Sequence, residues 1–494
     1  MKQKEKALII GSGVAGMASA IRLKVMGFDV DVFESNDYPG GKLAEFNNGE
    51  YRFDAGPSLF TMPHYVDELF ELAGKNPRDY YSYIKKDLVC NYFFDDKTRF
   101  TAYSDKEKYA QEAEKVFQTD AVEIKKYFSN AQKKFELTAP LFLENSLHIF
   151  KNYLKIETVK AIAQLHQLSI FSTLDEHNAK YFKDARLQQL FNRYATYNGS
   201  SPFLTPGIMG MIPHLEQHYG TFFPIGGMIS ITQALYQLAK DLGVNFEFSS
   251  PVDKIIIRNS AAVGVRVLGK EKLGDLVISN MDIVPTYRKL LKEQIAPAKT
   301  LKQERSSSAL IFYWGIRKQF KDLDLHNILF SADYKAEFDA IFNQKTIPSD
   351  PTVYIHISSK DEPRDAPDGC ENWFVMINVP GNTGQDWDAL IPLARKVIIE
   401  RINKCLDTNI ESFIENEELL EPRTIESRTQ SFQGSLYGAA SNNRFAAFLR
   451  HPNFSSRLKN LYFCGGSVHP GGGIPLALLS GKITSGIIEK NSNK

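Results

Sequence analysis

The sequence predicts an α/β protein built around a Rossmann-type nucleotide-binding domain, with an α+β lobe beside it. Three observations support this fold class. An apolar run leads into a glycine-rich turn at residues 7–16, and a second leads into a glycine-rich loop at residues 461–473. Strand-like and helix-like segments alternate from about residue 300 to 420. A strand, a glycine turn and a helix N-terminus together form a site for an electron-rich group. The chain has two such sites, one near each end.

The N-terminal segment has every part of a dinucleotide-binding βαβ unit. Ala7–Ile10 resembles a buried parallel strand, residues 14–26 have helical spacing, and Asp29–Phe33 alternates like a second strand. Glu34 follows, 21 residues after Gly13. The glycines provide the turn, the approach to the pyrophosphate and the helix packing, and the acid binds the ribose hydroxyls. The predicted Rossmann-type site comprises Gly11, Gly13, Val14, Ala15, Gly16, Glu34 and Ser35.

The same N-terminal segment has some features of a secretory signal peptide, since three lysines precede an apolar stretch of small residues. Glycines in dinucleotide register interrupt that stretch, and its removal would delete the first strand. We therefore interpret it as part of the fold.

The segment after the ribose-binding acid distinguishes FAD from NAD. Two adjacent glycines allow the backbone to pack tightly on the nucleotide, and the lysine that follows them adds a cation. An NAD-binding domain has no need for this extension, so we predict FAD. The alternative for the glycine pair alone is an ordinary turn. The predicted residues are Gly41, Lys42, Gly56, Pro57 and Ser58.

The C-terminal segment predicts the second half of the site. Leu461–Cys464 is expected to be a buried strand, and the glycines after it let the backbone pass close to a ligand. A proline suits the first turn of the helix that follows. The predicted residues are Gly465, Gly466, Gly473, Ile474 and Pro475.

The composition excludes several classes of protein. The chain has 494 residues, so two or more lobes are expected. Lysine and arginine total 59 and aspartate and glutamate 58, which gives no support for nucleic-acid binding. The four cysteines lie far apart, which argues against a disulfide framework or a metal site and fits a reducing cytoplasm. No uncharged apolar stretch reaches the roughly 18 residues needed to span a membrane.

These motifs together resemble the flavin-containing amine oxidase superfamily, and more closely the carotenoid desaturases of bacterial phytoene-desaturase type. Phe222–Met228, Asp275–Met281 and Ser307–Gly315 also match, in the family order. Amine oxidases generally carry an acidic residue near the position of Gly466, where this chain resembles the carotenoid branch. The segment Gly465–Pro475 is most similar to hydroxycarotenoid 3,4-desaturases.

The resemblance implies a discontinuous FAD-binding domain of residues 1–75, 222–295 and 422–494. It also implies a helical, membrane-facing substrate region at 76–221 and a substrate-binding sheet at 296–421. Val252 and Asn280 are expected to contact the cofactor. The implied reaction is desaturation of a carotenoid, here 3,4-desaturation of a 1-hydroxylated acyclic end, with oxygen or a quinone as candidate final acceptors.

Three other functions remain open at this stage: a general phytoene-type desaturase, a carotenoid cis–trans isomerase that uses reduced flavin, and a prenyl-binding protein without flavin. The last is similar in fold to Rab GDP-dissociation inhibitors, but those lack a complete flavin site.

Several residues are candidates for chemistry or substrate contact. His469 lies among the predicted flavin-contacting glycines and could take a proton, although it could equally only shape the turn before Pro470. His214, Glu216 and His218 form a second candidate cluster, for which a polar helix end is the simpler alternative. The segment at 191–219 is rich in aromatic and small residues, and its expected cavity residues are Tyr194, Tyr197, Asn198, Phe203 and Met209.

One segment suggests peripheral attachment to a membrane. Leu141–Phe150 carries many large apolar side chains and is followed by Lys151 and Lys155. Such a segment can lie in the membrane interface with its lysines at the headgroups, although an ordinary packed helix has the same pattern. We expect a cytoplasmic protein that associates peripherally with the membrane.

Overall fold

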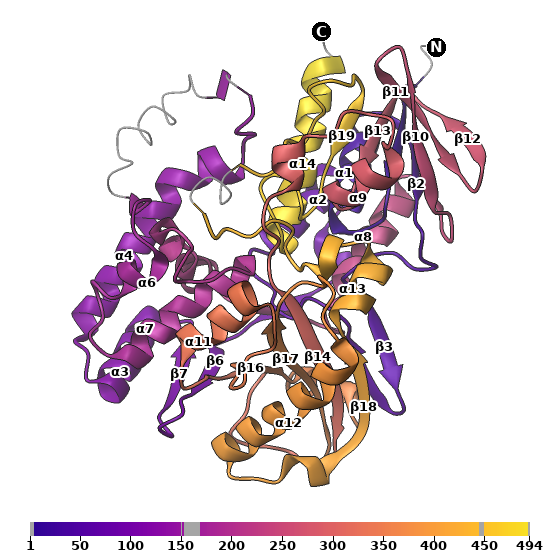
Figure 1. Cartoon of the computed structure of the whole chain (residues 1–494). Helices are drawn as coiled ribbons and strands as arrows, with labels where there is room; N and C mark the ends of the chain where they lie inside the picture. Colours follow the sequence, from indigo (N-terminus) through magenta and orange to yellow (C-terminus); the bar gives the residue numbers. More distant parts are fainter. Residues whose placement is uncertain (1–3, 150, 153–167, 444–448, 493–494) are drawn as a thin grey trace.

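The computed structural model describes residues 4–149, 151–152, 168–443 and 449–492. The molecule has three parts: a parallel sheet with its helices, a large mixed sheet and a helical part (Figure 1). Residues of all three line one cavity. The two ends of the chain lie at the same side of the molecule, beside the parallel sheet (Figure 1).

The five-stranded sheet contains the parallel strands that the sequence predicts. All its neighbouring strands pair in parallel, and the first strand of the chain lies in the middle. This places the glycine turn after that strand where the strand order reverses, the usual position of a ligand in such sheets. The strands, in spatial order, are β19 (Leu461–Phe463), β13 (Leu276–Ser279), β1 (Lys6–Ile10), β2 (Asp29–Phe33) and β9 (Asn245–Glu247).

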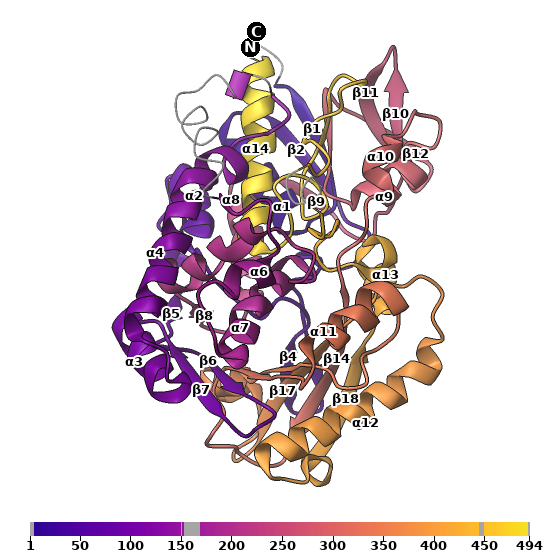
Figure 2. The same ribbon diagram turned by 60° about the vertical axis from the view of Figure 1, so that its left-hand side comes forward.

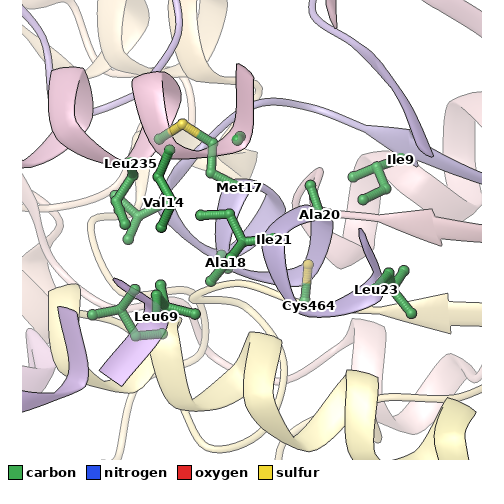
Figure 3. Packing of buried hydrophobic residues seen from close by; sticks show 14 of the residues in the cluster. Ile9, Val14, Met17, Ala18, Ala20, Ile21, Leu23, Leu69, Leu235 and Cys464 are labelled. Atoms are coloured by element: carbon green, nitrogen blue, oxygen red, sulfur yellow. The ribbon is translucent and has the colours of Figure 1, made fainter. Parts of the chain in front are cut away.

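Helix α1 (Val14–Val25) is buried along most of its length. Its side chains Val14, Met17 and Ile21 pack with Leu235 and Leu69 from neighbouring helices (Figure 3). The first turn of α1 also packs closely on the glycine turn before it. A Cβ on Gly16 would overlap the Gly11 carbonyl, so this contact requires glycine. The surrounding helices are α2 (His64–Leu72), α8 (Ile229–Asp241) and α14 (Ile474–Ser492).

Short strands and turns extend this part of the molecule. An antiparallel ribbon of three strands leaves the parallel sheet, and its first residue, Val252, lines the cavity. The ribbon comprises β10 (Val252–Arg258), β11 (Ala261–Val267) and β12 (Lys270–Leu273), and the other small elements are β3 (Glu45–Asn48), β4 (Tyr51–Asp54), β5 (Tyr83–Lys85), β8 (Phe222–Pro224), α9 (Ile283–Pro285), α10 (Ala298–Leu301) and α13 (Pro422–Thr429).

The second sheet has seven strands and extends beyond residues 296–421. Two of its strands come from the segment at 76–221, and one of them pairs in parallel with β15. Helix α12 (Trp387–Leu406) packs on this sheet, where Trp387 and Ile398 join its hydrophobic core. The strands, in spatial order, are β18 (Ile414–Leu420), β14 (Ser308–Ile316), β17 (Glu371–Val379), β16 (Val353–His356), β15 (His326–Leu329), β6 (Leu88–Phe93) and β7 (Arg99–Tyr103).

The helical part covers one end of this sheet (Figure 2). Its helices begin at Lys106, after the strands at 83–103, and a series of single turns follows at 193–219. The elements are α3 (Lys106–Phe117), α4 (Ala121–Thr138), η2 (Ala139–Leu143), α6 (Leu174–Asn178), α7 (Ala185–Asn192), η5 (Arg193–Asn198), η6 (Gly207–Met211) and η7 (Leu215–Tyr219), and α11 (Tyr334–Asp339) packs beside them.

The segment predicted to meet the membrane is only partly described. Its first residues form the turn η2, whereas Phe150 and Lys155 lie outside the described residues. Among the described residues, no helix is both long and apolar enough to cross a bilayer.

Candidate active site

A cavity of ≈ 1110 Å³ is lined by residues of both large sheets and of the helical part. At one side its wall consists of the two glycine loops that follow β1 and β19. The rest of the wall carries large apolar side chains, such as Phe135 and Phe374, together with a few polar ones, such as Glu216 and His326. The cavity therefore joins a polar half, suited to a nucleotide, to an apolar half.

Glu34 is fixed at the carboxyl end of β2, beside the first glycine loop. Its Oε2 atom accepts hydrogen bonds from the backbone N of Ser12 at 2.7 Å and from the Ser12 hydroxyl at 2.9 Å. The backbone N of Asn36 donates to Oε1 at 3.0 Å. Only 5% of Glu34 is exposed, and it lines the cavity. The carboxylate is thus held at the position expected for the ribose-binding acid.

The side chain of Asn280 lies between the two glycine loops. A Cβ on Gly13 would lie 2.8 Å from Asn280 Nδ2, and a Cβ on Gly465 would lie 2.6 Å from Asn280 Oδ1. Gly465 also has φ +105°, a conformation that favours glycine. Both loops therefore pack closely around one amide at the end of β13, and at Gly465 the backbone conformation also favours glycine.

Lys42 is partly buried and directly follows the adjacent glycines Gly40 and Gly41. Its Nζ atom donates to the carbonyls of Ser435 at 3.1 Å and Leu436 at 3.0 Å. Burial lowers the pKa of Lys42 to about 8, opposed by the nearby Asp282 carboxylate. The Lys42 amine therefore carries the expected positive charge at neutral pH and loses it when the pH rises above about 8. These two hydrogen bonds connect the N-terminal segment to the residues between α13 and β19.

Tyr437 and Arg450 pack against the C-terminal glycine loop, and both also line the cavity. A Cβ on Gly472 would lie 2.8 Å from the Cα atom of Tyr437. Arg450 donates to the carbonyls of Tyr437 at 2.7 Å and Gly466 at 3.3 Å, and burial lowers its pKa to about 10. The loop leads directly into α14, whose first residues, Ile474 and Pro475, line the cavity. The sequence interpretation missed both supporting residues, because no local motif connects them to the loop.

His469 lines the cavity and is only 2% exposed. Its Nε2 atom lies 2.9 Å from the carbonyl oxygen of Asn145, so Nε2 carries the proton that forms this hydrogen bond. Burial lowers the pKa of His469 to about 4. The imidazole is therefore neutral at physiological pH, with its lone pair on Nδ1.

The apolar half of the cavity lies between the helical part and the second sheet. Its side chains come from the end of α4, from η2 and η7, and from β14 and β17. The sequence interpretation assigned none of them to the cavity, although Phe142 and Leu143 lie in the segment predicted to meet the membrane. The principal ones are Phe135, Phe142, Leu143, Ile311, Phe374 and Met376.

A family model described as flavin containing amine oxidoreductase matches residues 14–488. The chain belongs to this family. It is 56% identical to a 1-hydroxycarotenoid 3,4-desaturase of Flavobacterium sp. (strain P99-3), over 98% of this chain and 99% of that protein. It is 31% identical to a 4,4'-diapolycopene oxygenase of Methylomonas sp, over 97% of each chain.

Solved structures show the same fold at low sequence identity. A putrescine oxidase triple mutant has a TM-score of 0.65 at 14% identity, covering 99% of both chains. Cyclohexylamine oxidase from Brevibacterium oxydans has a TM-score of 0.62 at 13% identity, covering 100% of both. The predicted fold class is therefore confirmed, and the protein is an oxidoreductase of this flavin family.

FAD is the cofactor that this family implies, and the residues of the cavity fit it. The N-terminus of α1, the buried Glu34 and the close approach at Gly13 suit the ADP half. All the predicted cofactor residues line the cavity except Gly16, which lies behind it at the contact of α1 with the Gly11 turn. Which atoms of the chain contact FAD stays a prediction.

The cluster predicted at His214, Glu216 and His218 divides into two. Glu216 forms a buried ion pair with Arg193, with 3.1 Å between Arg193 Nη2 and Glu216 Oε2, and lines the cavity. The two histidine rings instead stack on each other, with centroids 4.6 Å apart. Burial lowers the pKa of His214 to about 4. The carboxylate therefore has an arginine partner that the sequence interpretation did not include.

The residues predicted to contact substrate also divide. Tyr197, Asn198 and Met209 line the cavity. Tyr194 is buried behind the wall and is 2% exposed. Phe203 packs against Phe338, with ring centroids 6.3 Å apart, and is not among the lining residues. Residue type alone could not distinguish the residues that line the cavity from those that do not. The single turns at 193–219 are too short to give a regular spacing of buried and cavity-facing side chains.

Proposed function

We propose that the protein is an FAD-dependent desaturase that introduces a double bond between carbons 3 and 4 of an acyclic carotenoid end bearing a hydroxyl on carbon 1. The observation that carries this proposal is the 56% identity to a 1-hydroxycarotenoid 3,4-desaturase over nearly all of both chains. The continuous cavity, with its polar and apolar halves, supports it.

A carotenoid carbon chain offers no polar group at the bond to be oxidised. Desaturation removes a hydride from one carbon and a proton from its neighbour, and the two carbons then share a new double bond. FAD supplies the hydride acceptor, because no side chain can take a hydride. The chain's own task is to hold the polyene in the apolar half and to aim one bond at the polar half. Large apolar residues such as Phe135, Phe374 and Met376 suit this task.

We propose His469 as the residue that takes the proton. Its imidazole is neutral and its Nε2 atom is bonded to the Asn145 carbonyl, so the proton would go to Nδ1. The low pKa makes it a weak base, which suffices if the departing hydride leaves a strongly acidic allylic cation. His469→Gln should then lower kcat, because proton removal is impaired, while leaving FAD content intact. An unchanged kcat would assign His469 to the turn alone.

The reaction is tested by product mass. Purified protein loaded with FAD would be incubated with a 1-hydroxylated acyclic carotenoid, and the products separated and weighed. Loss of two hydrogens and a longer-wavelength spectrum are expected. An unchanged mass would indicate an isomerase, and a gain of oxygen would indicate an activity like that named for the Methylomonas relative. Protein purified without flavin would indicate prenyl binding only. Preference for phytoene would indicate a general phytoene-type desaturase.

We also propose that the protein takes its substrate from a membrane surface. The support is that Phe142, Leu143 and Leu147, from the segment predicted to meet the membrane, line the cavity. Liposomes should therefore raise turnover and retain part of the protein on flotation, with release by high salt or high pH. Turnover indifferent to lipid would contradict this. Oxygen and quinones are the proposed final acceptors, and anaerobic turnover with an added quinone separates them.

A further inference from the structure

A buried carboxylate in the cavity wall is held by two tyrosines. Glu216 is only 2% exposed and is paired with Arg193. The Tyr194 hydroxyl donates to its Oε2 atom at 2.5 Å, and the Tyr197 hydroxyl donates to its Oε1 atom. Burying such charges beside an otherwise apolar chamber is costly, even when they are paired. An ion pair at this position therefore calls for a role in the site.

The two tyrosines share the carboxylate but differ in what else they face. Tyr194 is fully packed behind the wall, whereas Tyr197 lines the cavity and keeps part of its surface accessible. The Tyr197 hydroxyl donates its hydrogen bond to Glu216, so its oxygen still has lone pairs that can accept another hydrogen bond. A hydrogen bond to a carboxylate polarises the phenol and makes its oxygen a better acceptor.

The turn that carries Tyr197 packs, through Gly199, on Tyr437, which in turn packs on the C-terminal glycine loop. Gly199, two residues further along, is packed so tightly that a Cβ there would lie 3.0 Å from Tyr437 Cδ2. Tyr437 also packs against Gly472, where a Cβ would lie 2.8 Å from Tyr437 Cα. A single residue therefore separates the turn that carries Tyr197 from the loop where the flavin ring is expected.

This closeness matters for the proposed reaction. In a 1-hydroxylated substrate desaturated between carbons 3 and 4, only one carbon separates the hydroxyl-bearing carbon from the reacting bond. The group that binds the hydroxyl must therefore lie beside the flavin, not at the far end of the apolar chamber. Tyr197 lines the cavity and sits on a turn that one residue, Tyr437, separates from that loop. Its phenol oxygen suits a tertiary alcohol, which donates one hydrogen bond.

We propose that Tyr197, polarised by Glu216 and Arg193, accepts a hydrogen bond from the substrate's hydroxyl and so determines specificity for hydroxylated carotenoid ends. This inference rests on the proposed function. A substrate without the hydroxyl leaves the Tyr197 oxygen facing apolar carbon, and the loss of that hydrogen bond disfavours it.

The test compares Tyr197→Phe with Tyr194→Phe, which is a matched control. Both variants remove one hydrogen bond to Glu216 and keep the aromatic ring, but only one changes the cavity wall. For each, kcat/KM is measured on a 1-hydroxylated carotenoid and on its unhydroxylated parent, after flavin content and Tm are recorded. The preference for the hydroxylated substrate should fall about 10- to 100-fold in Tyr197→Phe. In Tyr194→Phe it should stay within about twofold.

The outcomes separate this inference from the proposed function. If the wild-type protein prefers the hydroxylated substrate and Tyr197→Phe keeps that preference, Tyr197 does not bind the hydroxyl, while the function stands. An equal fall in both variants would also overturn the inference, because the ion pair would then act only by shaping the wall. A wild-type protein that prefers the parent overturns the proposed function itself.

A substrate analogue keeps the inference testable if Tyr197→Phe does not fold. The methyl ether of the hydroxylated carotenoid cannot donate a hydrogen bond. The wild-type protein should convert it about as poorly as the unhydroxylated parent. Conversion as efficient as that of the alcohol would show that no donated hydrogen bond is used and would refute the assignment.

Discussion

Replacing Gly13 with valine tests where the nucleotide lies. The backbone of Gly13, at φ −63° and ψ 168°, is open to any residue, so the change adds no backbone strain. A Cβ there would lie 2.8 Å from Asn280 Nδ2, the far end of a flexible side chain. The folded chain can therefore accept the new side chain with a small shift. The branched methyl groups would instead occupy the space through which the pyrophosphate approaches the loop.

The expected effects on stability and on binding differ in size. Moving the Asn280 amide by a few tenths of an ångström should cost about 1 kcal/mol of unfolding free energy, at the lower end of overpacking costs. Excluding the pyrophosphate should weaken FAD binding by at least about 100-fold, which corresponds to about 3 kcal/mol. The assay is flavin absorbance per mole of protein after dialysis, together with thermal unfolding of the flavin-free protein.

Gly486→Val is the matched control, since Gly486 has no atom within 4 Å of an added Cβ. It should keep a full complement of FAD. Normal FAD content in Gly13→Val would refute the placement of the nucleotide. A collapse of the flavin-free Gly13→Val protein would also contradict the reasoning, because the loss of flavin would then reflect unfolding.

The remaining predictions concern the cofactor and acid stability. Glu34→Ala should weaken FAD binding by about 10- to 100-fold, less than Gly13→Val, because it removes ribose hydrogen bonds and leaves the phosphate site; titration of flavin-free protein measures this. Acid precipitation should release the flavin, as expected of non-covalent FAD, and flavin remaining in the pellet would exclude that. Burial lowers the pKa of His451 and His469 to about 4, from an ordinary 6.5. The unfolded chain therefore binds more protons between those values, and stability should fall as pH drops from about 6.5 to 4, by about 1.4 kcal/mol per unit for each histidine. Denaturant titrations across this range check it, and a flat profile would show that both groups are already accessible.

The nucleotide half of the site follows from local sequence. β1, the Gly11–Gly16 turn, α1, β2 and Glu34 are consecutive, and each step has a period or a residue type that the backbone geometry requires. The loop from Gly465 to Pro475 is local in the same way. The sequence could therefore predict these residues together, including Asn280 at the end of its strand.

The substrate half depends on contacts between distant segments. β6 joins β15 in the second sheet, and no pattern in either strand specifies the other as its partner. Glu216 is paired with Arg193 and not with the histidines beside it in the sequence, since single turns let neighbouring side chains point in different directions.

The sequence by itself determined the flavin family, the βαβ unit and the glycine loops, because these depend on residue types at fixed spacing. Only the tertiary structure decided that Tyr197 lines the cavity while Tyr194 lies behind it, and that His469 is buried against the Asn145 carbonyl. The physical reason is that burial and side-chain direction in irregular turns are set by the packing of all the surrounding segments, which no local period encodes.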